Sequence, residues 1–236
     1  MRRAFTLAEV LITIGIIGVV SAITIPVVIN KYRAKVLETQ FKKSYSTMLQ
    51  AFEKTKTDLE VENVADVFAV YNGTTYELAP EFENTFDKNL KVIKKIQNFY
   101  PFENYNGTAT ATFNLGRDFP DCRKILSDGS SYNTNINSSK INIFIDINGP
   151  YKRPNRYGHD IFMFEARQND NVVRPVKMTK EYTEDELKDV RYPHIAGAPC
   201  NLTSKQQANG MGCSYYAVNN ICPYDNSKKY WDCLPR

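Results

Sequence analysis

The stretch from Phe5 to Ile29 is the feature that most limits what this chain can fold into. It is almost unbroken apolar sequence that carries one charge, Glu9. At about 1.5 Å of rise per residue, a helix of this length crosses a hydrocarbon core of roughly 30 Å. The sequence therefore predicts a membrane-spanning helix over residues 5–29. A carboxylate inside such a segment is costly, which makes Glu9 a functional candidate.

The residues before the span point to a particular kind of processing. A secretory signal peptide has its small-residue cleavage site after the apolar stretch, whereas here the small residue, Ala4, comes before it. Cleavage after Ala4 would leave the apolar helix on the mature chain. The run Ala4-Phe5-Thr6-Leu7-Ala8-Glu9, followed by Pro26, resembles the signal of the type IV pilin and type II secretion pseudopilin family, which usually has glycine where Ala4 stands.

The resemblance implies roles for the residues of this signal. A prepilin peptidase would cut between Ala4 and Phe5, and the new N-terminus on Phe5 would be methylated. Glu9 would neutralise the amino terminus of a neighbouring subunit, since a buried carboxylate needs a positive partner. The implied partners are other pilin-like subunits in a homo- or hetero-filament, an inner-membrane assembly platform and the lipid bilayer.

The span and its continuation predict one long helix from about residue 6 to residue 57. Gly15 and Gly18 lie one turn apart, which either lets helices approach closely or reflects the tolerance of membrane helices for glycine. Pro26 is expected to kink or locally melt the helix. After Asn30 an apolar stripe recurs at helical spacing and predicts that residues 30–57 pack against a folded domain through one face; its members are Tyr32, Val36, Phe41, Tyr45, Leu49 and Phe52.

Residues 58–199 are predicted to form a globular domain, so that residues 1–4 are a leader and residues 200–236 a cysteine-rich segment. We expect a turn at Asn72-Gly73, a helix over 80–99 and a short strand at 109–115. Alternating isoleucines in 140–147 predict a strand with one buried face, and 160–166 and 172–178 are further strands. Thr183 and Glu186 resemble a capping box that opens a helix ending near Val190. The predicted fold class is α+β, with the long N-terminal helix packed on a small antiparallel sheet and a disulfide-rich C-terminal tail.

Four of the five cysteines lie in the last segment, and their spacings match no zinc-binding pattern. They indicate two disulfides formed in an oxidising compartment. The pairing Cys200–Cys213 with Cys222–Cys233 is preferred because it closes short loops, and the other two connectivities remain open. Cys122 is left over and is expected to be a buried free thiol.

The topology signals conflict. Two arginines precede the span, but Lys31, Arg33 and Lys35 follow it, and positive-inside counting alone favours a cytoplasmic C-terminus. The cysteines and the resemblance favour the opposite orientation. We therefore expect a single-pass protein of the bacterial inner membrane with a periplasmic C-terminal domain. The net charge is +4, including the two leader arginines, which argues against a nucleic-acid surface.

The loop over residues 146–160 is the strongest candidate for a ligand site. It offers hard oxygen donors that suit Ca²⁺, from Asp146, Asn148, Asn155 and Asp160. It is not an EF-hand, because Tyr157 occupies the position of the bidentate glutamate. The residue pattern of the loop is similar to that of a calcium-binding loop of type II secretion pseudopilins. The alternative is a hairpin loop that uses these residues for turn chemistry alone.

Enzyme signatures are thin, and the chain is expected not to be an enzyme. Neither His159 nor His194 belongs to a recognisable catalytic motif, and pairing Cys122 with His159 has no support from sequence spacing. The expected function is that of a prepilin-like subunit of a type II secretion pseudopilus. The alternatives are a type IV pilus or competence pilin, and an exported enzyme or binding protein held by a signal anchor.

Overall fold

The computed structural model describes residues 6–74, 76–96, 102–108, 110–111, 124–137, 139–190 and 196–235. Its contacts divide the chain into two units, Met1–Val36 and Leu37–Arg236, which are considered separately below. The expectations for Ala4, Phe5, Cys122 and His194 lie outside the described residues.

Helix α1 spans Leu7–Asp58 and confirms the long N-terminal helix. The helix continues through Pro26 without a break, so the expected local melting does not occur; a kink there stays a prediction. Lys54 and Asp58 pair across one turn near its end, at 2.7 Å.

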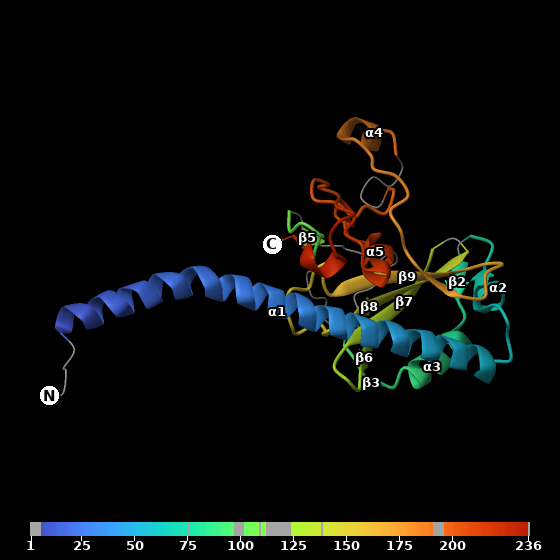
Figure 1. Ribbon diagram of the computed structural model, residues 1–236. Helices are drawn as coiled ribbons and strands as arrows, with labels where there is room; N and C mark the ends of the chain where they lie inside the picture. The colour runs from blue at the N-terminus through green and yellow to red at the C-terminus, as the bar shows by residue number, and fades with distance from the viewer. Residues whose placement is uncertain are drawn as a thin grey trace. The chain divides into compact units, whose positions relative to one another are not determined.

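A six-stranded antiparallel sheet forms the centre of the second unit, and the α+β fold class is confirmed (Figure 1). Its strand order is β10 (Val173–Pro175), β9 (Ile161–Arg167), β8 (Lys140–Asp146), β7 (Ser131–Asn137), β6 (Lys124–Leu126) and β3 (Val92–Lys95). Two small hairpins flank it, β1 (Ala69–Tyr71) with β2 (Tyr76–Leu78), and β4 (Phe102–Glu103) with β5 (Thr110–Ala111). The shorter helices are α2 (Val64–Phe68), α3 (Pro80–Asn89), α4 (Glu184–Lys188), α5 (Cys213–Asn219) and a 3₁₀ turn at Tyr230–Asp232.

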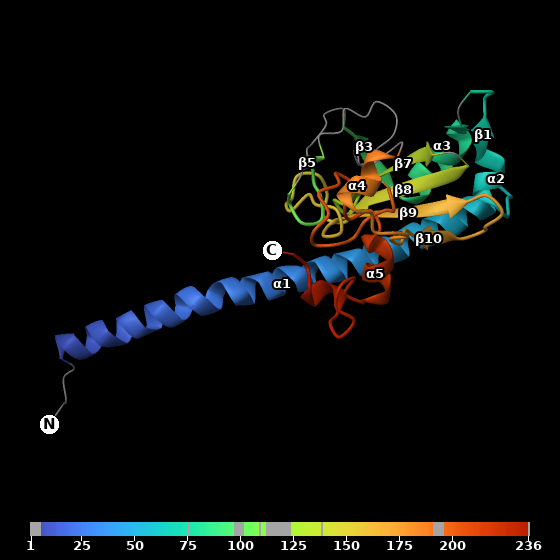
Figure 2. The ribbon, with the colours of Figure 1, turned by 90° about the horizontal axis from the view of Figure 1, so that it is seen from above.

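One face of the sheet packs against the second half of α1, which runs along it (Figure 2). Phe41 is 2% exposed, and its ring lies 4.5 Å from that of Phe162 on β9. Phe52 packs edge-on against Phe82 and Phe86 of α3, with both pairs of centroids 6.2 Å apart. The amphipathic stripe is confirmed at Phe41 and Phe52 but is wrong at Tyr32, which is 70% exposed.

The other face of the sheet is buried as well, which corrects the expectation of one buried face for 140–147. Ile141, Ile143 and Ile145 point into the core against α1, whereas Phe144 joins a second apolar cluster with Met163 of β9. The second cluster also contains residues from the C-terminal segment, including Met211. Strand β8 is covered on both faces because α1 packs on one face and residues of the second cluster pack on the other.

The predicted helix over 80–99 is too long. Pro80 occupies the first turn as expected, but α3 ends at Asn89. Lys91 has a positive φ of 59°, a left-handed conformation that ends helices, and the chain then pairs as β3 with β6. Ile93, expected on the buried helix face, is 67% exposed. The strands at 160–166 and 172–178 correspond to β9 and the shorter β10.

The C-terminal segment is tied together by the two expected disulfides, Cys200–Cys213 and Cys222–Cys233. It also contributes to the main core, which the sequence pattern did not indicate. The Trp231 ring lies 5.5 Å from that of Phe41, and the Tyr230 hydroxyl donates a 2.5 Å hydrogen bond to the carbonyl of Gly158. The capping box at Thr183 and Glu186 is present and opens α4.

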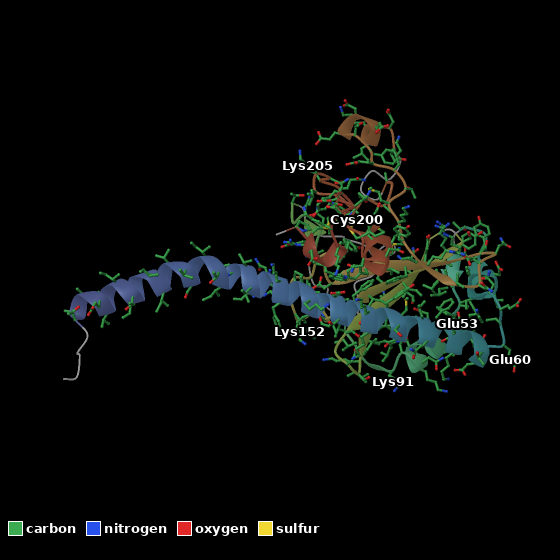
Figure 3. All side chains as sticks on the ribbon, viewed as in Figure 1. Glu53, Glu60, Lys91, Lys152, Cys200 and Lys205 are labelled. Atoms are coloured by element: carbon green, nitrogen blue, oxygen red, sulfur yellow. A yellow bond between two sulfur atoms is a disulfide. The ribbon has the colours of Figure 1, made fainter. Side chains whose placement is uncertain are left out.

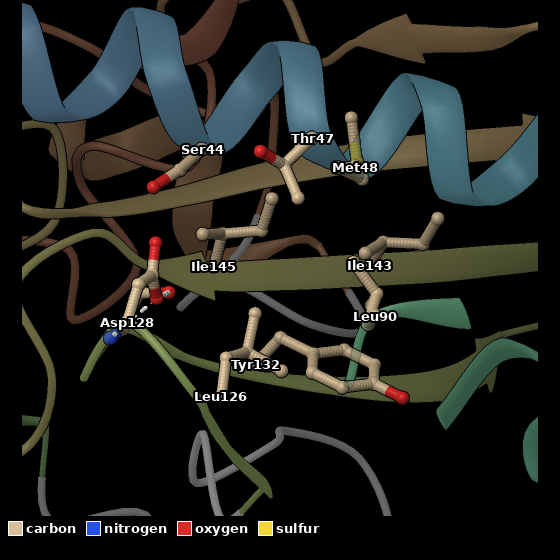
Figure 4. A pocket seen from close by; sticks show the side chains of 10 residues that line it. Ser44, Thr47, Met48, Leu90, Leu126, Asp128, Tyr132, Ile143 and Ile145 are labelled. Atoms are coloured by element: carbon tan, nitrogen blue, oxygen red, sulfur yellow. Dashed lines mark hydrogen bonds between the residues drawn. The ribbon is translucent and has the colours of Figure 1, made fainter. Parts of the chain in front are cut away.

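The packing between α1 and the sheet leaves a small cavity (Figure 4). Met48 and Ser44 face it from the helix, and Ile143 and Ile145 face it from β8. Its volume of about 10 Å³ holds at most a single water. This gap is a packing defect of the core and is too small to be a ligand site.

Candidate functional sites

The first half of α1 is apolar and uncovered. An 18-residue window of it has a mean hydropathy of 2.5, and none of that window is buried. Figure 3 shows its side chains standing out along the helix. Length and composition make this helix able to cross a membrane, as expected. A surface this apolar needs lipid or other apolar helices around it.

Glu9 is engaged by the first turn of its own helix. Its Oε2 accepts hydrogen bonds of 2.8 Å from both the backbone N–H and the hydroxyl of Thr6. The Thr6 Oγ1 in turn accepts a 3.3 Å bond from the Glu9 N–H. This reciprocal pair is a capping box, in which a threonine and a glutamate three residues later satisfy the free N–H groups of a helix start. Thr6 is a site residue that the sequence reasoning missed, although the Thr-x-x-Glu spacing was visible.

Gly15 and Gly18 face open space. A Cβ atom built on either glycine meets no heavy atom within 4 Å. Within the single chain, therefore, no contact requires a glycine at these positions. They leave two shallow places on the helix surface where another helix backbone can approach.

The four predicted oxygen donors lie in one loop at the end of the β8–β9 pair. Asp146 pairs with Ile161 in the ladder, and the N–H of Ile147 bonds the carbonyl of Asp160 at 2.9 Å. Both carboxylates are fully buried. Asp160 accepts 2.7 Å bonds from the N–H groups of Asn155 and Arg156. Asp146 accepts a 2.8 Å bond from the N–H of Gly149.

Two amide oxygens of this loop are buried without a hydrogen-bond donor. The Nδ2 of Asn148 donates to the carbonyl of Arg153, and that of Asn155 donates to the carbonyl of Pro150, each at 3.2 Å. These bonds direct each Oδ1 away from the carbonyls, and neither Oδ1 has a partner. A buried unpaired acceptor costs about 1–3 kcal/mol. A hard cation would satisfy these acceptors, so the residues fit Ca²⁺.

The electrostatics of the loop also favour a cation. Burial raises the pKa of Asp160 to about 7, although N–H bonds from Arg156 and Asn155 oppose that rise. A buried carboxylate of this kind needs either a proton or a positive partner. No group of three or more His, Cys, Asp or Glu side chains with metal-binding geometry occurs in the described ranges. The candidate donor set is instead two carboxylates and two amide oxygens.

His159 is a buried structural residue. Its Nε2 lies 3.1 Å from the carbonyl oxygen of Tyr105, and the rings are 5.5 Å apart. Burial, together with the nearby Arg156 charge, lowers the pKa of His159 to about 3. The imidazole is therefore neutral at physiological pH and donates to the Tyr105 carbonyl.

An open cleft of about 630 Å³ lies between the α4 region and the loop that follows Cys200. Its walls carry mostly polar side chains, among them Glu181, Asn201 and Gln206. Asn201 is already used within the protein, since its Nδ2 donates to Glu181 at 2.9 Å. Polar walls that bond to one another do not indicate a particular ligand.

Comparison with known proteins does not assign the chain to a family: no family model, curated protein or solved structure matches it.

Proposed function

We propose that this chain is a prepilin-like structural subunit of a type II secretion pseudopilus or a related type IV filament. Prepilin peptidase would remove residues 1–4, and the mature chain would wait in the inner membrane with its C-terminal domain in the periplasm. Assembly would then pack the apolar helices together as a filament core. The protein would act by assembly with other pilin-like subunits on an inner-membrane platform, without a catalytic reaction.

The observation that carries the proposal is the sequence from Ala4 to Glu9, whose last residues begin an uncovered apolar helix. A plain membrane anchor needs neither a small residue before the span nor a carboxylate within its first turn. A charge in hydrocarbon is expensive, by about 2.5–3.5 kcal/mol for Asp at the helix centre on insertion scales, and the cost is smaller near the end of the span, where Glu9 lies. A function that needs a negative charge at Glu9, such as binding the amino terminus of a neighbouring subunit, accounts for that cost.

The loop over 146–160 favours a pseudopilus over a type IV pilus or a competence filament. In the proposal, Ca²⁺ is held by Asp146, Asn148, Asn155 and Asp160. The ion would add positive charge beside two buried carboxylates, and would fix the loop at the end of β8 and β9. The support is the pair of unpaired amide oxygens beside those carboxylates.

The test is the N-terminus and mass of the chain extracted from membranes, with and without an active prepilin peptidase. We expect a chain that starts at methylated Phe5 only when the peptidase is present. A chain that still starts at Met1 in the presence of the peptidase would refute the proposal.

The rival function is that of an exported enzyme or binding protein held by its span. It predicts that Glu9→Ala has no effect, whereas the filament proposal predicts loss of assembly with monomers retained in the membrane. Glu53→Ala is a matched control, because Glu53 lies on the same helix and is exposed. Sheared filament and membrane fractions, compared by immunoblot, separate the two functions.

A further inference from the structure

The cations directly after the apolar segment have no role in the function proposed above. Lys31, Arg33 and Lys35 fall within five residues, on a flank where positive-inside counting disfavours them. We propose that these three cations, together with Tyr32, bind anionic phospholipid headgroups in the leaflet on the side of the globular domain. The inference rests on the proposed function only in requiring that the helix spans a bilayer with that domain outside.

The height of the cations along the helix matches the headgroup layer. From Leu7 to Ile29, α1 rises through about 33 Å, close to the roughly 30 Å of a hydrocarbon core. The next six residues rise through about 9 Å, which takes them through the headgroup region of that leaflet. When the apolar segment fills the core, Lys31 and Arg33 therefore lie within the headgroup layer, and Lys35 lies at its outer edge.

The direction of the side chains strengthens this placement. In an α-helix each Cα–Cβ bond tilts toward the N-terminus, so side chains on this flank lean back toward the bilayer. Long cationic side chains can then keep their stems against apolar surface and their charges among phosphates. Tyr32 is 70% exposed, and tyrosine is enriched at the membrane–water interface.

The charges of Lys31 and Arg33 are not compensated along the helix. No acidic residue occurs between Glu9 and Glu38. Lys31 and Arg33 are exposed and form no ion pair within the part of the chain that the structure describes. The next cation along, Lys42, differs because its Nζ lies 2.6 Å from Glu38. Exposed cations beside an apolar span attract anionic lipids.

The experiment measures lipid selectivity of the full-length chain in bilayer nanodiscs. Spin-labelled phosphatidylglycerol or phosphatidylcholine is added in trace amounts, and electron paramagnetic resonance gives the motionally restricted fraction of each. The test variant is Lys31→Gln/Arg33→Gln/Lys35→Gln. The matched control is Lys88→Gln/Lys91→Gln/Lys94→Gln, which removes the same charge from exposed positions in the globular unit.

Each cation near a charged membrane surface contributes about fivefold in affinity. We expect the unaltered chain to prefer phosphatidylglycerol, the test variant to lose at least about fivefold of that preference, and the control to keep it. The preference should also fall with added salt. Arg2 and Arg3 are the same in every sample, so their contribution cancels. Three results would each overturn the inference. They are equal restricted fractions of the two lipids around the unaltered chain, a preference for phosphatidylglycerol that is kept in the test variant, and a loss of that preference in the control as large as in the test variant.

Failure of the lipid-binding inference can be distinguished from failure of the proposed filament function. A chain that is never cleaved before Phe5 but shows the expected selectivity refutes the filament proposal and supports the lipid surface. A chain that is cleaved and assembled but shows no selectivity does the reverse.

Discussion

Calcium should offset a large part of the pH dependence of stability that the 146–160 loop imposes on the protein. The folded-state pKa of Asp160 is about 7, against 3.8 for an ordinary aspartate, because the carboxyl is fully buried. Between about pH 4 and pH 7 the folded chain therefore holds a proton that the unfolded chain has lost. Stability should fall as pH rises through this window. The difference of about three pKa units corresponds to about 4 kcal/mol at most.

Calcium removes the need for that proton. At a concentration 100-fold above its dissociation constant, a ligand that binds only the folded state adds about 2.7 kcal/mol. For a domain of about 200 residues this raises the melting temperature by about 5–10 °C. We expect this increase at pH 8, and a much smaller one at pH 5, where protons compete for the carboxylates.

The assay is differential scanning calorimetry of the detergent-solubilised chain from pH 5 to pH 8, in EDTA and in Ca²⁺. Asn148→Ala should weaken Ca²⁺ binding at least about tenfold, because it removes one of the unpaired oxygens. Asn142→Ala is the control, since Asn142 is a buried asparagine of β8 that bonds Asn135 outside the loop. Superimposable curves in EDTA and Ca²⁺ at pH 8 would refute the reasoning about this loop.

Two further predictions concern the packing under the sheet and are read by thermal or denaturant unfolding. Phe41→Ala should lower the free energy of unfolding by about 3–5 kcal/mol, because the ring is 2% exposed and contacts Trp231. Ile93→Ala, at an exposed position, should lower it by under about 0.5 kcal/mol. Equal effects of the two substitutions would contradict the packing of α1. Asp87→Asn should lower the free energy of unfolding by about 1–3 kcal/mol at neutral pH, because the buried Lys124 ammonium loses its nearer carboxylate, at 2.8 Å, and keeps only that of Glu83, at 3.1 Å. Burial acts to raise the pKa of Asp87, but hydrogen bonds led by that of Lys124 hold it below its usual value. The carboxylate therefore stabilises the fold above about pH 4. The difference in unfolding free energy between the variant and the unaltered chain should shrink as pH falls below that value. A difference that is constant from pH 7 to pH 3 would contradict this.

The sequence predicted those elements whose signal is local. Alternating isoleucines gave β8, the Thr183–Glu186 spacing gave α4, and the short cysteine loops gave the disulfide pairing. The helix over 80–99 was too long because Ile93 continues the helical spacing of the phenylalanines before it. The helix ends early because Lys91 adopts a left-handed backbone conformation. A lysine in the sequence does not indicate that conformation.

Elements that depend on distant partners were not predictable from local patterns. Strand β7 is a polar run, and it is a strand because all seven of its residues pair with β8. Trp231 belongs to the core only because the C-terminal segment returns to α1. In the candidate calcium loop, composition identified the four donors, but only the folded loop reveals which of their oxygens lack a hydrogen bond.

The capping box at Thr6 and Glu9 gives the Glu9 carboxylate a role in the monomer, helix capping, besides its proposed role in filament assembly. In a single chain, the first N–H groups of the helix have no helical carbonyl to bond, so the cap lowers the cost of the exposed helix start. In the proposed filament, a neighbouring amino terminus offers Glu9 a charge-assisted bond, which is stronger than a neutral one. Glutamine can cap a helix as glutamate does but carries no charge. Glu9→Gln should therefore leave the amount of membrane monomer unchanged and abolish filaments, whereas Thr6→Val should reduce the monomer and leave the assembled fraction per monomer unchanged. Quantifying membrane monomer and assembled filament for each variant distinguishes the two roles. Normal filaments from Glu9→Gln would show that assembly does not require the charge.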